Sequence, residues 1–365
     1  MVRECSSTRA PCRVALVGAG LIGRRHAALI ADSHDLELAA LIDPTDTARG
    51  LAAEFGCHWV ADITDDGLPS DIDGAIIATP NQVHEAHAVV AIERGWPVLI
   101  EKPIADTVAA ADRIAHAAER NAVPVLVGHH RRYNPIIERA KAAVDDGRLG
   151  RIVAAHGMFW IAKPDAYFDT EWRRQPGAGP VLINAIHDID LIRHLCGPVA
   201  YVQAIASNSV RGFAVEDTAV ALLQFASGAV GTMTISDTIA APWSWELTSA
   251  ENAAYPKTEE PCYFIGGTAG ALSLPGSALW TYDGAPDWWS AIDKSDLDAS
   301  YADASSNAGP LRRQLAHFAE VIRGEAKPRV SAEDGRAALA IVMALTKSAR
   351  EDGHRVAIDG EEPAH

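Results

Sequence analysis

The chain has 365 residues, 48% of them hydrophobic, and is long enough to bury the cores of two domains. It carries 48 acidic against 32 basic side chains, a formal net charge of -16, which disfavours binding to nucleic acid or to anionic membrane surfaces. No apolar run is long enough to cross a bilayer, and the first residues lack the apolar segment of a secretory signal. We therefore expect a cytoplasmic protein without nucleic-acid or membrane partners.

The cysteines and closely spaced histidines do not match a metal-site motif. No two cysteines have CxxC spacing, and His84 and His87 form HxxH rather than the HExxH of metalloproteases. We therefore expect reduced thiols, no metal, and a structural role for this histidine pair. The cysteines are Cys5, Cys12, Cys57, Cys196 and Cys262.

The first third of the chain alternates short apolar runs with helical stretches. Continuous apolar runs between helices are typical of a parallel sheet that is covered on both faces. The pattern predicts an α/β Rossmann domain, a doubly wound parallel sheet over residues 12–128, preceded by a flexible N-terminus at 1–11. The predicted strands are 13–17, 36–43, 74–79, 97–100 and 123–127.

The pattern changes near Gly128 to closely spaced strands punctuated by Gly, Asp and Ser, as in an antiparallel meander. It predicts an α+β domain with an open, mainly antiparallel sheet over residues 129–365. The predicted strands are 151–161, 199–207, 217–227, 228–236, 262–267 and 270–276. A helix is expected at 136–150, a surface loop at 283–310, and closing helices at 311–324 and 331–352, with Ser331 and Asp334 in a capping-box-like arrangement.

The stretch "RVALVGAGLIGRRHAALI" reads as strand, GxGxxG turn and helix. Gly18 permits the tight turn, Gly20 lets a pyrophosphate approach the backbone, and Gly23 lets helix and strand pack closely. The helix N-terminus then faces the phosphates. The motif predicts a dinucleotide site, and the alternative is a glycine turn without a ligand.

Asp43 ends the second predicted strand, 20 residues after Gly23. A carboxylate at this place accepts the ribose hydroxyls of NAD and repels the extra phosphate of NADP. NADP stays open, since Thr45, Thr47 or Arg49 could hold that phosphate. The alternative role for Asp43 is a strand-end cap.

In "WPVLIEKPI" a buried strand ends at Glu101, Lys102 and Pro103. An ammonium at the carboxyl end of a parallel strand lies where such sheets bind ligands, and it can donate to a reacting oxygen there. The alternative is a lysine that pairs only with Glu101 or extends to solvent. The turn Thr79–Asn81 follows another strand into the same crevice, although Asn81 could instead be a helix N-cap.

A second candidate for proton transfer lies in "GAGPVLINAIHDIDLIRHLCG", read as a loop followed by a helix. Asn184, His187 and Asp188 would then share one helical face, at i, i+3 and i+4. A histidine suits a general base near neutral pH, although it could also be a satisfied core residue. Asp188 and Asp190 either orient His187 or decorate the helix surface, and we favour decoration.

The motifs "VGAGLIGRRH", "ATPNQVHEAH", "IEKPIAD", "VGHHRRYNP" and "INAIHDIDLIRHL", in this order, resemble the Gfo/Idh/MocA oxidoreductases. The resemblance implies that Lys102 lies where the nicotinamide ribose meets the substrate, that the turn at Thr79 lies beside the cofactor, and that His187 is the acid/base. One position departs from the family. Many members carry an aspartate four residues before this histidine, where this chain has Ile183.

The resemblance predicts an NAD(P)-dependent dehydrogenase acting on a ring secondary hydroxyl of a sugar, inositol or related cyclic polyol, in a homodimer or homotetramer. The alternatives are a glycoside-cleaving enzyme that retains NAD and a non-catalytic NAD-binding sensor. The predicted cofactor residues are Gly18, Gly20, Leu21, Ile22, Gly23, Asp43, Thr79, Pro80, Asn81, His84, Glu101 and Lys102. The predicted substrate residues are Arg131, Tyr133, Trp172, Arg173, Asn184 and His187, with His156, Lys163 and Tyr167 as further candidates; surface arginines and core aromatics are the alternative reading.

Overall fold

The computed structural model describes residues 9–285, 287–297 and 309–358. The chain divides into two compact units, a first of residues 1–130 and 311–336 and a second of residues 131–310 and 337–365. The expected second domain at 129–365 differs from this division, because residues 311–336 belong to the first unit. Most of the predicted flexible N-terminus, and Cys5, lie outside the described residues.

The first unit contains a parallel sheet of order β3-β2-β1-β4-β5-β6. Its strands are β1 Cys12–Val17, β2 Leu36–Ile42, β3 His58–Val60, β4 Gly74–Ile77, β5 Val98–Ile100 and β6 Val125–Val127. The order reverses direction at β1, which pairs with β2 on one side and β4 on the other. Ligands of doubly wound sheets bind outside the carboxyl ends of the strands at such a reversal.

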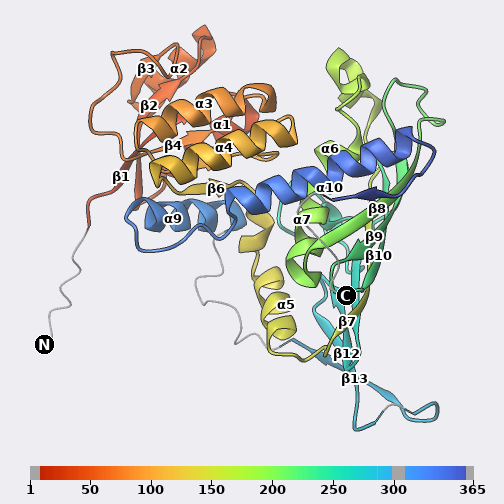
Figure 1. Ribbon diagram of the computed structural model, residues 1–365. Helices are drawn as coiled ribbons and strands as arrows, with labels where there is room; N and C mark the ends of the chain where they lie inside the picture. Colours follow the sequence, from red (N-terminus) through yellow and green to blue (C-terminus); the bar gives the residue numbers. More distant parts are fainter. Residues whose placement is uncertain (1–8, 286, 298–308, 359–365) are drawn as a thin grey trace, which may run out of the picture. The chain divides into compact units, whose positions relative to one another are not determined.

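Two helices of the first unit begin at a side-chain cap. The helices of this unit are α1 Leu21–Ala31, α2 Asp46–Phe55, α3 His84–Glu93, α4 Val108–Asn121 and α9 Pro310–Ile322. Thr45 and Thr107 cap α2 and α4 by accepting hydrogen bonds from Ala48 N and Ala110 N. Helix α9 lies with this unit although it comes late in the chain (Figure 1). Its placement rests on long-range contacts, such as the bond from Val127 N to Val330 O just beyond it.

The second unit contains a nine-stranded sheet of order β14-β13-β12-β11-β7-β10-β9-β8-β15. Its pairs are antiparallel except for β7 with β10, which confirms the mainly antiparallel sheet. The strands are β7 Ile152–Trp160, β8 Val199–Ser207, β9 Thr218–Phe225, β10 Val230–Ser236, β11 Tyr263–Gly267, β12 Gly270–Leu274, β13 Ala278–Tyr282, β14 Ile292–Asp296 and β15 Val356–Ala357.

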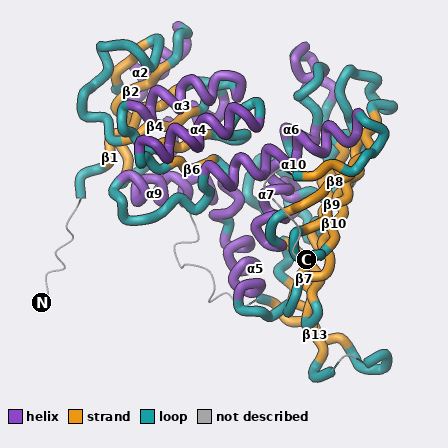
Figure 2. Tube along the Cα trace, viewed as in Figure 1, coloured by secondary structure: helices purple, strands orange, loops and turns teal. Residues whose placement is uncertain are grey.

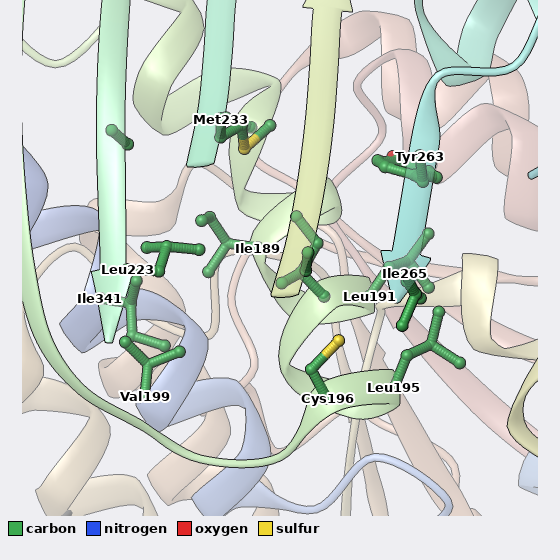
Figure 3. Close-up of a cluster of buried hydrophobic side chains, with 14 of the residues drawn as sticks. Ile189, Leu191, Leu195, Cys196, Val199, Leu223, Met233, Tyr263, Ile265 and Ile341 are labelled. Atoms are coloured by element: carbon green, nitrogen blue, oxygen red, sulfur yellow. The ribbon is translucent and has the colours of Figure 1, made fainter. Parts of the chain in front are cut away.

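One face of this sheet is covered by helices and forms the core of the unit (Figure 2). The helices are α5 Pro135–Asp145, α6 Pro180–Ile183, α7 Ala185–Cys196, α8 Trp245–Thr248 and α10 Ala332–Arg350. Strand β9 shows the reason, since Ala219, Ala221 and Leu223 are buried while the alternate side chains point outward. Figure 3 shows Ile189 of α7 beside Leu223, and Leu195 of α7 beside Ile265, in the buried core.

The prediction of a loop at 283–310 was wrong in part. Residues 292–296 form β14, which pairs with β13. Every side chain of β14 is exposed, so backbone pairing holds this strand without an apolar pattern that a sequence could show. Residues 286 and 298–308 of the predicted loop lie outside the described part of the chain. None of the helices that the structure describes has both the length and the apolar content to cross a bilayer.

Candidate functional site

The glycine turn after β1 has the geometry that a pyrophosphate site needs. Gly18 has a φ of +101°, and a Cβ there would lie 2.6 Å from the Ala78 carbonyl oxygen. A Cβ on Gly23 would lie 2.0 Å from the Gly18 oxygen, so the helix packs on the turn only with glycine. Gly20 faces open space and caps α1 without a side-chain bond, and Leu21 after it is 92% exposed. The amides of the first helical turn therefore face an open rim.

Asp43 lies at the end of β2, beside this turn. Its Oδ2 accepts from Ala19 N at 2.9 Å, and its Oδ1 accepts from Thr45 N at 2.9 Å and Thr45 Oγ1 at 2.6 Å. Partial burial raises the pKa of Asp43, but the bonds from Thr45 and Ala19 outweigh it, so the net pKa is lowered and the carboxyl is ionised at neutral pH. Of the roughly four lone-pair positions of this carboxylate, about one stays open. Asp43 can therefore accept a hydrogen bond from one ribose hydroxyl, whereas bonds from both hydroxyls were expected.

Two of the three residues considered as holders of an NADP phosphate have other contacts. Thr45 donates to Asp43 and caps α2. The Arg49 guanidinium lies 4.2 Å from the centre of the Trp59 ring, and Trp59 Nε1 donates to the Asp43 carbonyl at 3.1 Å. Thr45 and Arg49 are thus engaged in contacts within the protein, and the negative charge of Asp43 favours NAD over NADP.

We expect Asp43→Ala to weaken NADH binding about 10- to 100-fold, the loss of a hydrogen bond to a charged group. NADPH binding should fall much less, because the substitution also removes the charge that repels its phosphate. Titration of nucleotide fluorescence gives both dissociation constants. Asp46→Ala, an exposed change in the first turn of α2, is the control. Equal losses for the two nucleotides would contradict the assigned role of Asp43.

A buried histidine contacts the turn that follows β4. His84 is 1% exposed, and its Nδ1 and Nε2 lie 3.0 and 2.8 Å from the carbonyl oxygens of Pro103 and Thr79. Burial lowers the pKa of His84, although these two carbonyls favour its charged form. The imidazole links the loops that follow β4 and β5, a positioning role that differs from the predicted contact with the cofactor. Asn81 begins a 3-10 turn and caps neither it nor α3.

Glu101 and Lys102 leave β5 in different environments. Glu101 is 5% exposed, and its Oε1 lies 2.7 Å from Nε2 of His26, a fully buried residue of α1. Burial raises the pKa of Glu101, but His26 outweighs it and lowers the net pKa. This carboxylate contacts α1, which favours a supporting role for Glu101 over the predicted contact with the cofactor. Lys102 is half-buried at the carboxyl end of β5, and its catalytic role stays a prediction.

In the second unit the predicted helix around His187 is broken. Asn184, with φ -107° and ψ -57°, ends α6 and precedes α7. Asn184 thus lies between two helices, in an αR conformation, rather than inside the one helix that was predicted. The backbone carbonyl oxygen of Asn184 accepts a hydrogen bond from the backbone N–H of His187 at 3.1 Å. His187 is 8% exposed, close to the start of α7.

The aspartates of α7 were predicted to decorate its surface, and this was wrong. Asp188 and Asp190 are 0% and 1% exposed. Asp190 accepts from Arg132 at 2.9 and 2.5 Å. Asp188 accepts from Arg131 at 2.8 Å and from the hydroxyl of Tyr263. Charged side chains that are fully buried are paired, and the pairs here anchor α7 to the segment that follows β6.

These ion pairs also bear on the predicted substrate residues. Arg131 is 4% exposed and divides its guanidinium between Asp188 and Glu246, the latter at 2.6 Å. Tyr133 is 1% exposed. The burial of both side chains favours a structural role over the predicted contact with substrate. The clue in the sequence was the pair of acids within the apolar helix "AIHDIDLIRHLC", because buried acids demand buried partners.

Four other candidates come together beyond β7. The guanidinium of Arg173 lies 4.1 Å from the Tyr167 ring and donates to the Tyr167 carbonyl at 2.7 Å. Lys163 Nζ lies 4.9 Å from the same ring and donates to Asn184 Oδ1 at 2.8 Å. Trp172, 53% exposed, borders Arg173. This cluster is therefore linked to the residue that precedes α7.

His156 does not belong to this cluster. It points to the uncovered face of the sheet, where it stacks on Phe264 and bonds to Thr232 at 2.7 Å. Its neighbour in the strand, Ala155, is buried in the core on the opposite face. This placement separates His156 from the other substrate candidates.

Comparison with known proteins identifies both parts of the chain. Residues 12–129 match an oxidoreductase family with an NAD-binding Rossmann fold, GFO/IDH/MocA, and residues 137–273 match the GFO/IDH/MocA C-terminal domain. The rhizopine catabolism protein MocA of Rhizobium meliloti is 27% identical over 93% of this chain and 96% of its own. Inositol 2-dehydrogenase 1 of Saccharopolyspora erythraea is 29% identical over 96% and 98%.

Among solved structures, the WlbA dehydrogenase of Bordetella pertussis in complex with NADH and UDP-GlcNAcA has a TM-score of 0.78 and 25% identity. The match covers 96% of this chain and 98% of that one. The open glycine turn and the ionised Asp43 fit the same cofactor. The chain therefore belongs to the Gfo/Idh/MocA family and is an oxidoreductase whose Rossmann domain binds NAD.

Proposed function

We propose that this protein is an NAD-dependent dehydrogenase that oxidises a ring secondary hydroxyl of a sugar, inositol or related cyclic polyol, or reduces the corresponding ketone. The observation that carries the proposal is the open glycine turn beside an ionised Asp43, in a family of oxidoreductases. Relatives named as inositol 2-dehydrogenases, and a neighbour crystallised with a nucleotide sugar, support this substrate class.

The proposed reaction assigns one task to each catalytic side chain. NAD, held at the glycine turn and Asp43, would supply the hydride acceptor when bound. The ammonium of Lys102 donates to the reacting oxygen and eases loss of its proton. His187 accepts that proton, since position 183 is isoleucine and offers no carboxylate there. Residues Glu101 and His84 act indirectly by holding the loops after β4 and β5.

The test is nicotinamide absorbance at 340 nm while purified protein meets inositols, aldoses, uronic acids, lactones and glycosides, with NAD and NADP separately. Reduction of NAD by one class of ring polyol is the expected result. Release of sugar from a glycoside without accumulation of NADH would instead indicate the glycosidase that retains its cofactor. Binding of NADH without turnover of any compound would indicate a sensor.

We further propose that the uncovered face of the nine-stranded sheet binds a second copy of the chain. Large apolar side chains are exposed there at 40–56% on β7, β9, β10 and β11, and a symmetric pair of sheets would bury them. They include Val153, Val220, Leu222, Val230 and Phe264. No described part of the chain covers this face.

Leu222→Glu is expected to shift the protein from dimer or tetramer to monomer. In a symmetric interface the two introduced carboxylates would repel each other, and both would lose their hydration. Sedimentation velocity measures the mass. Val210→Glu, at a 68% exposed position outside the strands, is the control and should leave the assembly unchanged. A wild-type monomer at micromolar concentration would contradict the proposal.

A further inference from the structure

Arg24 is the fourth residue of α1, and its side chain returns to the glycine turn. Its Nε donates to the carbonyl oxygen of Ala19 at 3.3 Å. Side chains on a helix lean toward the helix N-terminus, which brings a residue at this position within reach of the turn. Arg24 is exposed, and it forms no ion pair and no other hydrogen bond with the described residues. The terminal nitrogens of its guanidinium therefore keep their N–H donors for a ligand.

The backbone of Ala19 is held at both of its polar groups. Its N–H donates to Oδ2 of Asp43 at 2.9 Å, and its carbonyl oxygen accepts from Arg24. A peptide group is planar, so these two bonds restrict the turn between Gly18 and Gly20 before any cofactor binds. Arg24 is thus a fixed part of the glycine turn, although it lies after the last glycine of the motif.

The charges around the turn leave a need for a cation. The pyrophosphate of a dinucleotide brings a negative charge on each of its phosphates, and the ionised Asp43 already lies beside the turn. The N-terminus of α1 supplies about half an elementary positive charge, and the first turn of α1 contains no acid that would oppose it. The guanidinium of Arg24 adds a full charge, in a planar fork that matches the oxygens of a phosphate.

Arg25 provides an internal comparison. It is the next residue of the same helix and is also exposed, but it forms no hydrogen bond or ion pair with the described residues. Successive side chains on an α-helix point about 100° apart, because one turn takes 3.6 residues. The two arginines therefore carry the same charge on the same helix, and only Arg24 is bonded to the turn.

We infer that Arg24 binds the pyrophosphate of NAD through its terminal N–H groups, while its Nε holds the carbonyl of Ala19. The phosphates were expected to bind at the backbone of the glycine turn and at the helix N-terminus, with no side chain involved. The inference concerns cofactor binding alone, so it goes beyond the proposed reaction and does not depend on the substrate.

Arg24→Gln is the main variant, because glutamine can still donate to Ala19 but carries no charge. Fluorescence titration should show that NADH and NADPH both bind about tenfold or more weakly, and by the same factor, since they share the pyrophosphate. In competition with NADH, ADP-ribose should lose affinity to the same extent, whereas adenosine, which has no phosphate, should be unaffected. Arg24→Lys keeps the charge without the fork and should recover part of the loss.

Arg25→Gln is the matched control and should change each dissociation constant by less than about twofold. Salt gives a second readout, since it screens exposed charges. Affinity of the wild-type protein for ADP-ribose should fall as sodium chloride is added. This dependence should be smaller in Arg24→Gln and unchanged in Arg25→Gln.

Three results would overturn the inference. A loss confined to NADPH would place Arg24 at the additional phosphate of NADP. Equal losses in Arg24→Gln and Arg25→Gln would show a general effect of net charge, and an equal loss for adenosine would show that the turn itself had been distorted. None of these measurements needs turnover, so the role of Arg24 can fail while the dehydrogenase stands, and the dehydrogenase can fail while Arg24 still binds the cofactor.

Discussion

Lys102→Ala is expected to lower kcat by about 10²- to 10⁴-fold, the usual contribution of a side chain that assists proton transfer. The dissociation constant for NADH should change less than about threefold, because the glycine turn and Asp43 hold the cofactor without this ammonium. Single-turnover kinetics with a substrate found in the panel measures the loss of the chemical step, and fluorescence titration measures NADH binding.

Lys141→Ala is the control for this substitution. Lys141 lies on α5 and pairs at i, i+4 with an exposed aspartate, Asp145, so its removal should leave kcat unchanged. A Lys102→Ala variant that binds NADH and keeps more than about a tenth of the wild-type kcat would show that Lys102 is structural, and His187 would then have to handle the proton alone.

Arg131→Met is expected to lower the free energy of unfolding by about 3–5 kcal/mol, the cost of breaking a buried ion pair from one side. The substitution leaves Asp188 buried without its cation and takes a 2.6 Å partner from Glu246. Burial already raises the pKa of Asp188 to about 6 against the opposing effect of Arg131, so loss of the arginine raises it further. Urea unfolding, followed by near-ultraviolet circular dichroism, measures the change.

Lys141→Met, which breaks the exposed pair of Lys141 with Asp145, is the control. It should lower the free energy of unfolding by at most about 0.5 kcal/mol. The double variant Arg131→Met/Asp188→Asn should be less destabilised than the single variants predict by addition, because the two side chains interact directly. An Arg131→Met variant as stable as Lys141→Met, with a raised KM, would instead return Arg131 to the substrate site.

Features that depend on a few neighbouring residues were predicted from the sequence. The glycine turn is one, because its strand, tight turn and helix lie within 20 consecutive residues and each glycine meets a local backbone demand. The distance from Gly23 to Asp43 is another, since one helix and one strand of ordinary length separate them. Five of the six parallel strands were found for the same reason, as continuous apolar runs. The short β3, three residues long, has too little pattern to be recognised.

Features that depend on partners far along the chain were decided only by the tertiary structure. Arg131 was predicted to bind substrate, with a surface arginine as the alternative, and only the fold shows that α7, 57 residues later, supplies it with a buried carboxylate. Helix α9 returned to the first unit, although it follows the second sheet in the chain. Asn184 was predicted to bind substrate from a helix, but the sequence does not show that its side-chain oxygen accepts from Lys163, 21 residues away, or that Lys163 pairs with Asp237. A side chain in a sequence carries its donors, acceptors and charge, but which of them are satisfied and which are left for a ligand depends on neighbours that folding alone brings within about 3 Å.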